Sequence, residues 1–254
     1  VRDVKFSVAM SVYKNDNAQH FDRALESITA FQTVKPSEIV LVVDGPVDDK
    51  LNGVIKKYEF AYPIFKVIRL DKNGGLGNAL KLAVENASYD LIARMDSDDV
   101  SLPTRFEQQL AFFESDSSVD IVGGDISEFI GEEDNIVACR KVPISDQKIK
   151  DYMRVRCPFN HVSVMYKKSA VLNAGGYLDL FWNEDYFLWI RMQLAGAKFA
   201  NTGTILVNVR TGADMYARRG GKRYFQSEKY LQKYMLEHKM IGYPTYISNV
   251  AKRL

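Results

Sequence analysis

The sequence contains few cysteines, no long hydrophobic run and almost no excess of one charge. Its two cysteines, Cys139 and Cys157, lack the spacing of a metal-binding motif. The simplest interpretation is a reduced chain in the cytoplasm, although one disulfide between them stays open as an alternative. No apolar run is long enough to span a bilayer, and the first residues do not resemble a signal peptide. A formal net charge of +2 argues against a dedicated nucleic-acid-binding protein, whose affinity would depend on neutralising phosphates.

The composition fits one globular domain with a helical tail. Of the 254 residues, 46% are hydrophobic and 26% are charged, which is ordinary for a protein with a sizeable core. We expect a single domain over residues 1–217. The tail, residues 218–254, carries nine lysines and arginines against two acids. We expect it either to pack as an ordinary helix with a solvated face or to rest on an anionic membrane surface.

Strand-like and helical segments alternate along the first half of the chain. The pattern predicts strands over residues 5–12, 38–43, 65–70 and 90–95 with a helix between each pair, then helices over 105–114 and 186–195 and strands over 119–123, 136–142, 162–166 and 205–209. This alternation predicts right-handed βαβ units and a mainly parallel sheet, beyond whose strand ends ligands bind. Tyr13, Asp44, Asn73 and Asp96 follow the first four strands, so we expect them to converge on one crevice.

Three acidic side chains occupy four positions after the fourth predicted strand. Asp96, Asp98 and Asp99 directly follow a short apolar run. Carboxylates this close repel one another unless a cation or an array of donors lies between them. Oxygen ligands of this kind suit Mg²⁺ or Mn²⁺. The alternative is an acidic turn that caps the next helix, because Asp and Ser are common at turns and N-caps.

Two further motifs follow strands of the predicted sheet. Asp44 can accept hydrogen bonds from a ribose hydroxyl or a base N–H, or it can form the turn before Gly45. The run from Asn73 to Gly77 lies between a strand and a helix, so its backbone N–H groups either face a phosphate or form a tight turn. This run has neither the P-loop signature nor the Rossmann glycine spacing.

The second half of the chain supplies further ionisable candidates. Glu184 and Asp185 open an apolar helix, where acids are favoured by the helix dipole, and one of them could instead serve as a general base. His161 precedes a predicted strand and is either structural or in contact with a phosphate or metal. Arg210 and the Arg218–Arg219 pair are either solvated charges or ligands of a diphosphate or a lipid-linked phosphate.

Together these motifs resemble the family-two glycosyltransferases, inverting enzymes with a GT-A fold. The similarity covers nearly the whole chain, and its motifs occur in the family's order: Ser11-Val12-Tyr13, Val42-Val43-Asp44-Gly45, Asn73-Gly74-Gly75-Leu76-Gly77, Met95-Asp96-Ser97-Asp98-Asp99 and Asn183-Glu184-Asp185-Tyr186 with Leu188-Trp189. Further segments resemble bacterial capsule, exopolysaccharide and O-antigen transferases: Asn160-His161, Gly175-Gly176-Tyr177 and Arg218-Arg219-Gly220-Gly221. The resemblance implies an α/β, Rossmann-like sheet flanked by helices. Residues 1–124 would bind a nucleotide-sugar, and residues 125–217 would form the acceptor and catalytic half.

The resemblance also implies roles for single residues. Asp98 and Asp96 would hold Mn²⁺ or Mg²⁺, and Asp185 would be the catalytic base, supported by Glu184. The implied donor-binding residues are Ser11, Tyr13, Asp44, Asn73, Gly75, Asp96, His161 and Arg210. The implied reaction moves a sugar from a nucleotide-diphospho-sugar, first of all a UDP-sugar, to a hydroxyl of a glycan or lipid-linked acceptor with inversion, in polysaccharide biosynthesis. The enzyme would act in the cytoplasm or on the inner face of the cell membrane.

Two alternatives belong to other classes of protein. A sugar nucleotidyltransferase shares the parallel sheet and the divalent ion, but it needs a glycine-rich, lysine-bearing signature near the N-terminus. Residues 7–16 contain no glycine. A regulatory module that binds a nucleotide without turnover is the second alternative, against which the Glu184–Asp185 pair argues.

Overall fold

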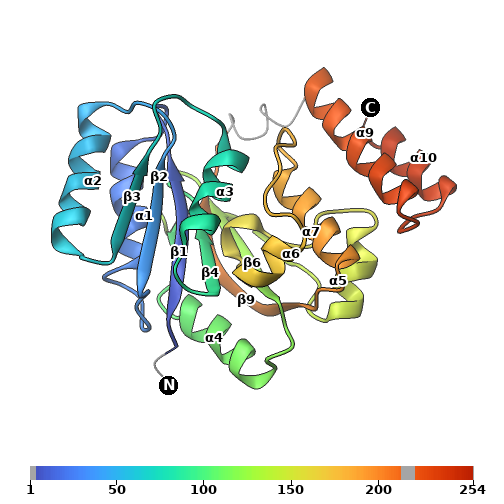
Figure 1. The fold of residues 1–254 in the computed structure, drawn as a ribbon, viewed down its shortest axis with the longest axis horizontal. Helices are drawn as coiled ribbons and strands as arrows, with labels where there is room; N and C mark the ends of the chain where they lie inside the picture. The colour runs from blue at the N-terminus through green and yellow to red at the C-terminus, as the bar shows by residue number, and fades with distance from the viewer. Residues whose placement is uncertain (1–3, 213–220, 254) are drawn as a thin grey trace.

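The computed structural model describes residues 4–212 and 221–253 of the chain. Its described part forms a nine-stranded sheet in the order β3-β2-β1-β4-β8-β6-β9-β5, with β7 paired to β6, and helices pack on both faces (Figure 1). The strands are β1 (Phe6–Val12), β2 (Glu38–Val43), β3 (Phe65–Arg69), β4 (Leu91–Met95), β5 (Val100–Ser101), β6 (Ile121–Phe129), β7 (Ile136–Arg140), β8 (Met165–Lys167) and β9 (Phe199–Arg210). The helices are α1 (Ala18–Ile28), α2 (Asp49–Ala61), α3 (Leu76–Asn86), α4 (Arg105–Ser115), α5 (Asp146–Met153), α6 (Lys168–Asn173), α7 (Glu184–Leu194), α9 (Lys222–Glu237) and α10 (Tyr243–Ala251).

The four longest strands of the first half form a parallel half-sheet. β1 pairs in parallel with β2 and with β4, and β3 adds to the far edge of β2. Every residue of β2 is buried, as expected for a strand with helices on both of its faces. One face packs on α1, α2 and α4, and the other packs on α3 and α7. The predicted βαβ organisation and the mainly parallel sheet are confirmed.

The region after residue 121 is more regular than its sequence pattern indicates. β6 continues to Phe129 and pairs in parallel with β9, and α5 was not predicted. Gly123 and Gly124 interrupt the apolar pattern of the strand. A Cβ at Gly123 would lie 2.3 Å from the side-chain oxygen of Asn201, and one at Gly124 would lie 2.5 Å from Leu206. The two glycines therefore permit β6 to approach its neighbours closely. They also weaken the hydrophobic pattern, so the full length of the strand is not predicted from the sequence.

Three other predicted elements differ from the structure, and one of them is β9, which begins at Phe199, six residues before the predicted strand. The strand predicted over residues 162–166 begins only at Met165, because a 3₁₀ turn (His161–Ser163) precedes it. The hydroxyl of Ser163 lies within hydrogen-bond distance of two backbone carbonyls, to which it can donate, and this contact holds the turn in place. The basic tail forms two helices, α9 and α10, where the pattern predicts one.

The C-terminal helices pack against α7. The ring of Phe187 on α7 meets Tyr230 and Tyr234 of α9 edge-on, with ring centroids 5.8 and 4.9 Å apart. Leu231 and Met235 are fully buried in the core that α3 and α7 share. The tail thus packs as an ordinary helix on one side while its other side stays exposed. Within residues 4–212 and 221–253, no helix is both long and apolar enough to cross a membrane.

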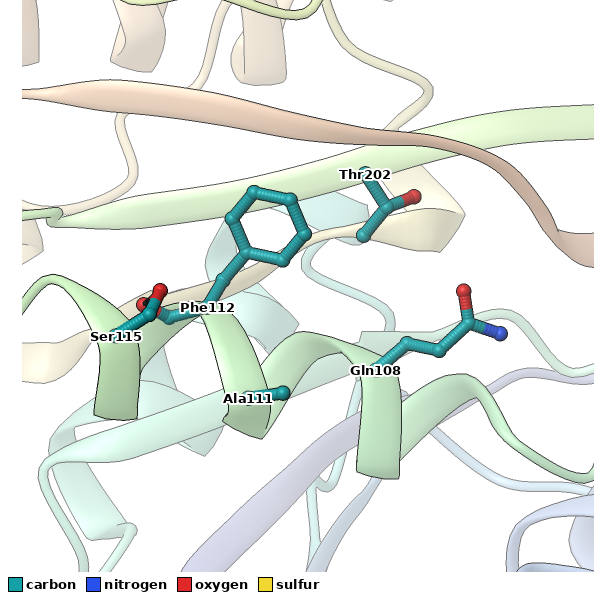
Figure 2. Close-up of a pocket in the computed structure, with 5 residues that line it drawn as sticks. All are labelled: Gln108, Ala111, Phe112, Ser115 and Thr202. Carbon is teal, nitrogen blue, oxygen red and sulfur yellow. Dashed lines mark hydrogen bonds between the residues drawn. The ribbon is translucent and has the colours of Figure 1, made fainter.

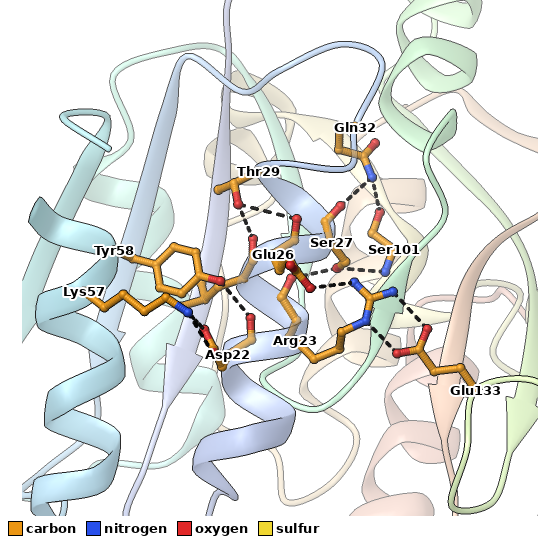
Figure 3. A network of polar contacts seen from close by, with 12 residues as sticks. Asp22, Arg23, Glu26, Ser27, Thr29, Gln32, Lys57, Tyr58, Ser101 and Glu133 are labelled. Atoms are coloured by element: carbon orange, nitrogen blue, oxygen red, sulfur yellow. Dashed lines mark hydrogen bonds and ion pairs between the residues drawn. The ribbon is translucent and has the colours of Figure 1, made fainter. Parts of the chain in front are cut away.

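A polar network fixes α1 between its neighbours (Figure 3). Arg23 donates to both carboxylate oxygens of Glu133, at 2.6 and 2.9 Å, and ties the turn between β6 and β7 to the helix. On the other side, Lys57 of α2 contacts Asp22 at 2.7 Å. Because α1 is held from two sides, the loop that connects it to β1 has a defined position at the strand ends.

Candidate active site

The carboxyl ends of β2, β1 and β4 lie side by side, because the three strands are adjacent and parallel. Tyr13 directly follows β1, Asp44 follows β2, and Asp96 follows β4. Ser11 lies inside β1, two residues after Ala9, so its side chain points to the same face of the sheet, which α3 and α7 cover. The structure therefore brings these residues to one edge of the sheet, as their positions after parallel strands predict.

Asp44 is bound to the glycine-rich run that follows β3. Its Oδ1 accepts the N–H of Gly74 at 2.6 Å, and its Oδ2 accepts the N–H of Gly75 at 3.0 Å and the side-chain amide of Asn73 at 2.8 Å. A Cβ at Gly45 would lie 2.7 Å from the backbone nitrogen of Asn73, so the two loops touch. These charge-assisted bonds mean that Asp44 orders the loop that begins α3, beyond forming its own turn. Gly75 provides no side-chain cap, so the first N–H groups of α3 are available to an anion.

A buried arginine, Arg94, lies beneath the acidic stretch. Its side chain is 2% exposed and forms an ion pair with Asp96, and its Nε has no hydrogen-bond partner in the part of the chain that the structure describes. Arg105 of α4 is also buried and donates to the carbonyl of Arg94 at 2.6 Å. Burial and the charge of Arg94 lower the pKa of Arg105 to about 9. Sequence analysis missed both arginines, although a charge in the centre of an apolar strand already indicates a buried partner.

The acids that follow Asp96 repel one another. Burial and the charges of Asp96 and Asp16 raise the pKa of Asp98 to about 6. Burial and the charges of Asp98 and Asp96 raise the pKa of Asp99 well above its usual range, although the Oδ1 of Asp99 accepts the N–H of Arg210 at 2.8 Å. The next element is β5, so the interpretation of this stretch as a cap for the following helix is wrong.

Arg210, at the end of β9, anchors the acidic loop from the side. Its Nε donates to the carbonyl of Asp98 at 3.2 Å, and its Nη1 donates to the carbonyl of Gly131 at 2.9 Å. The guanidinium also lies over the ring of Phe129, 4.6 Å from its centroid. The side chain thus positions the loop of Asp98, and its contact with a donor stays a prediction. The Arg218–Arg219 pair lies outside the described residues.

Glu184 and Asp185 form the first turn of α7. Burial and the charge of Asp185 raise the pKa of Glu184 to about 7, and the charge of Asp96 acts in the same direction. Since the charge of Asp96 acts on Glu184, the acids of α7 and those after β4 lie within electrostatic range of each other and form one candidate site. The thiol of Cys157 donates to Asp185 Oδ2 with a sulfur–oxygen distance of 3.8 Å. A Cβ at Gly77 would lie 3.5 Å from the Cβ of Glu184, which places α7 beside the start of α3.

His161 faces an aromatic cluster under the site. Its Nε2 lies 2.9 Å from the hydroxyl of Tyr177, and its ring centroid lies 6.0 Å from that of Trp189. Burial and the charge of Arg94 lower the pKa of His161 well below its usual range. The neutral ring with an internal partner fits the structural alternative, and contact with a phosphate stays a prediction.

A model of the family described as Glycosyl transferase family 2 matches residues 7–180. The chain belongs to this family. Among its relatives, an uncharacterized glycosyltransferase of Haemophilus influenzae is 45% identical over 225 residues, which cover 89% of this chain and 83% of that protein. A UDP-Gal:alpha-D-GlcNAc-diphosphoundecaprenol beta-1,3-galactosyltransferase of Escherichia coli is 35% identical over 250 residues, which cover 98% and 90%.

Solved structures share the fold at low sequence identity. TarS 1-349 of S. aureus in complex with UDP-GlcNAc superposes with a TM-score of 0.71 and 18% identity, over 98% of this chain and 71% of that chain. The mannosyltransferase PcManGT of Pyrobaculum calidifontis in complex with GDP-Man and Mn²⁺ gives a TM-score of 0.67 and 14% identity, over 97% and 68%. The GT-A fold expected for a family 2 glycosyltransferase is confirmed.

The acidic stretch of this family 2 glycosyltransferase suits a divalent ion only together with a substrate. Asp96 and Asp98 repel each other, and the charge of Arg94 acts on both. Over residues 4–212 and 221–253, no three side chains of His, Cys, Asp or Glu are arranged as a complete metal site. Mg²⁺ and Mn²⁺ are commonly held by one or two carboxylates plus the phosphates of a substrate, so the residues present fit such an ion.

The hollows on other faces of the family 2 enzyme contain none of these residues. One of about 360 Å³ lies between α4 and β9 and is lined by Ala111, Phe112 and Thr202 (Figure 2). Another of about 420 Å³ lies between α1 and α2. The acidic edge of the sheet at the strand ends is therefore the candidate site, which the pairing of the strands and the charges indicate.

The raised pKa of Glu184 predicts an unusual pH dependence of stability. Because the pKa of Glu184 is about 7 in the folded enzyme and 4.5 for an unperturbed glutamate, ionised Glu184 destabilises the fold above pH 7 and not below pH 4.5. The substitution Glu184→Gln mimics the protonated form, so it should raise the unfolding free energy of the metal-free protein by about 1–3 kcal/mol at pH 8 and leave it unchanged at pH 4.5. Denaturant melts at both pH values measure this, with the exposed Glu59→Gln as control. An equal effect at both pH values would contradict the assignment.

Proposed function

We propose that this family 2 glycosyltransferase transfers a sugar from a UDP-sugar to a hydroxyl of a glycan or lipid-linked acceptor, with inversion, in polysaccharide biosynthesis. The observation that carries this proposal is that two groups of acidic side chains lie close enough for their charges to interact. Asp96 and Asp98 follow a central parallel strand, and Glu184 and Asp185 open a buried helix, in which the charge of Asp96 contributes to the raised pKa of Glu184. One group suits the metal and diphosphate of a donor, and the other suits deprotonation of an acceptor.

The donor side is formed by the ends of β1, β2 and β4. Asp44 and the run from Asn73 to Gly75 would border the nucleoside, with Ser11 and Tyr13 beside them. Asp98 with Asp96 would hold Mn²⁺ or Mg²⁺ against the diphosphate. Such an ion offsets the negative charge that develops on the leaving diphosphate. The relative from Escherichia coli and the TarS complex, whose names contain a UDP-sugar, support UDP as the nucleotide.

The acceptor side is formed by α7. The acceptor oxygen would attack the anomeric carbon while the carboxylate of Asp185 takes the proton of the acceptor hydroxyl. The bond between the sugar and the diphosphate would break on the opposite side of the sugar. A single displacement of this kind inverts the anomeric centre, as in inverting hydrolysis with an alcohol in place of water. Glu184, with its pKa raised to about 7, can remain protonated beside the base and donate a hydrogen bond to it or to the acceptor.

Three further observations support the proposed acceptor and the proposed location of the enzyme. The relative from Escherichia coli is named for a lipid-diphosphate acceptor, and the exposed side of α9 presents Lys222, Arg223, Lys229 and Lys233. These charges would lie near anionic headgroups at the inner face of the cell membrane. Both cysteines are unpaired, as is usual in the reducing cytoplasm.

A panel of nucleotide-sugars tests the proposed reaction. We expect UDP-sugars with Mn²⁺ to raise the melting temperature and to be hydrolysed slowly, releasing UDP, because water can replace the absent acceptor. A sugar nucleotidyltransferase would instead form a UDP-sugar from UTP and a sugar phosphate with release of pyrophosphate. A binding module would be stabilised without any release of UDP. Either of these results would overturn the proposal.

A further inference from the structure

An exposed tryptophan occupies a strained turn just before α7. The N–H of Asn183 donates to the carbonyl of Leu180 at 2.8 Å and closes a β-turn whose third residue is Trp182. Trp182 has a φ of 59°, a left-handed conformation that turns normally assign to Gly or Asn at this position. A bulky aromatic residue there is an outlier, and such outliers persist only where the surrounding structure imposes them.

Both residues adjacent to Trp182 in the sequence contact α9. The guanidinium of Arg223 lies 4.1 Å from the ring centroid of Phe181. The side chain of Asn183 is buried and donates to Ser227 Oγ at 3.1 Å. The turn is therefore held on both sides, and Trp182, whose ring meets that of Phe181 edge-on at 5.8 Å, keeps 44% of its surface exposed. Burial does not explain this geometry, in contrast to Trp189, the other tryptophan of the chain, which is fully buried.

The turn lies at the rim of the acidic crevice. The segment that contains it passes over the start of α3, where a Cβ at Gly77 would meet the carbonyl of Leu178 at 3.6 Å and Glu184 Cβ at 3.5 Å. Trp182 precedes Glu184 by two residues and Asp185 by three. Figure 1 shows the beginnings of α7 and α9 on the side of the molecule where β1 to β4 end. The turn thus directly precedes the acidic first turn of α7 and lies between the start of α3 and α9.

We propose that Trp182 is a platform for a pyranose ring of the acceptor. Sugar rings have an apolar C–H face, and an aromatic ring with a negative face attracts it while burying apolar area. Tryptophan offers the largest such face, and the clamped turn supplies it in one orientation without further ordering. A sugar on this face would present a hydroxyl toward Asp185. The inference rests on the proposed transfer reaction and adds the residue that holds its second substrate.

Kinetics with a defined acceptor test the platform. The probe is N-acetylglucosamine α-diphosphate with a short alkyl chain, used with the UDP-sugar that the panel selects. We expect Trp182→Asn to raise the acceptor KM about 10-fold and to leave donor hydrolysis without acceptor unchanged. Since Asn tolerates the left-handed conformation, the same variant should raise the melting temperature by about 2–4 °C. Trp182→Tyr, which keeps an aromatic face, should retain most of the acceptor affinity.

Lys239 provides the matched control, because it also has a φ of 59° and follows the end of α9 in an exposed position. Lys239→Asn should give a similar gain in melting temperature with no change in acceptor KM. An unchanged acceptor KM in Trp182→Asn would overturn the inference. A loss of donor hydrolysis with an unchanged acceptor KM would also overturn it and would assign Trp182 to the donor.

Intrinsic fluorescence separates this inference from the proposed reaction. Adding the acceptor probe with UDP should shift the emission of the wild-type enzyme to shorter wavelength, and Trp182→Tyr should lack this shift. If no UDP-sugar is turned over while the shift remains dependent on Trp182, the proposed reaction fails and the sugar platform stands. If turnover is observed without any shift, the platform fails and the reaction stands.

Discussion

Replacing Asp185 by asparagine is expected to reduce sugar transfer by about 10³-fold while UDP binding stays unchanged. Asparagine has nearly the same shape, but its amide cannot take the proton of an acceptor hydroxyl. The hydrogen bonds that order the donor loop run from Asn73, Gly74 and Gly75 to Asp44, so the donor contacts should survive. Transfer rates at saturating donor, together with UDP titrations followed by calorimetry, measure the two effects separately.

Two variants in the same segment serve as controls for Asp185→Asn. Asp179→Asn removes an exposed carboxylate five residues before α7, and we expect nearly normal transfer. Glu184→Gln keeps a hydrogen-bonding side chain and should reduce transfer less than Asp185→Asn does. Near-normal turnover in Asp185→Asn would reject this residue as the base. A larger loss in Glu184→Gln would move that role to Glu184.

The substitution Asp98→Asn is expected to weaken UDP binding in the presence of Mn²⁺ by about 100-fold or more. The carboxylate is the metal ligand that the proposal assigns, and an amide is a poorer ligand for a hard cation. Without Mn²⁺, the variant and the wild-type enzyme should bind UDP with similarly low affinity. Equilibrium titrations of UDP with and without Mn²⁺ measure the difference.

The stability of the same variant gives an independent readout. Burial and the neighbouring acids raise the pKa of Asp98 to about 6, so its charge destabilises the metal-free fold above that pH. We therefore expect Asp98→Asn to melt at a higher temperature than the wild-type enzyme at pH 8 while losing metal-dependent binding. Glu59→Gln removes an exposed carboxylate and should change neither property. Full retention of Mn²⁺-dependent UDP binding in Asp98→Asn would remove the metal assignment.

Local patterns in the sequence were enough to locate most of the strands and the residues at their ends. β2 was predicted with the bounds that it has, because its run of branched apolar residues is buried on both faces and ends at a glycine turn. The same holds for the position of Asp96 after β4. The pattern failed at Gly123 and Gly124, where close contact with Asn201 and Leu206 requires residues that weaken a strand signal.

The contacts within the site depended on partners far apart in the sequence. Asp44 looked like a turn residue or a donor ligand, and the structure shows it bound to the glycine loop about 30 residues later. Arg210 looked like a surface charge or a phosphate ligand, and it holds the loop of Asp98 from the end of β9. The role of Arg94 was not predicted from the sequence, because its ion pair with Asp96 becomes necessary only once the strand is buried.

The sequence by itself determined the order of strands and helices, the acids that follow them and, through those motifs, the glycosyltransferase family. These features depend on hydrophobic periodicity and turn chemistry, which act between near neighbours along the chain. Only the tertiary structure decided which charged groups interact and which pKa values rise. It also decided how α9 contacts the turn before α7 and that Trp182 is exposed in a left-handed conformation. Burial, charge interaction and packing arise between distant segments, so no local pattern contains them.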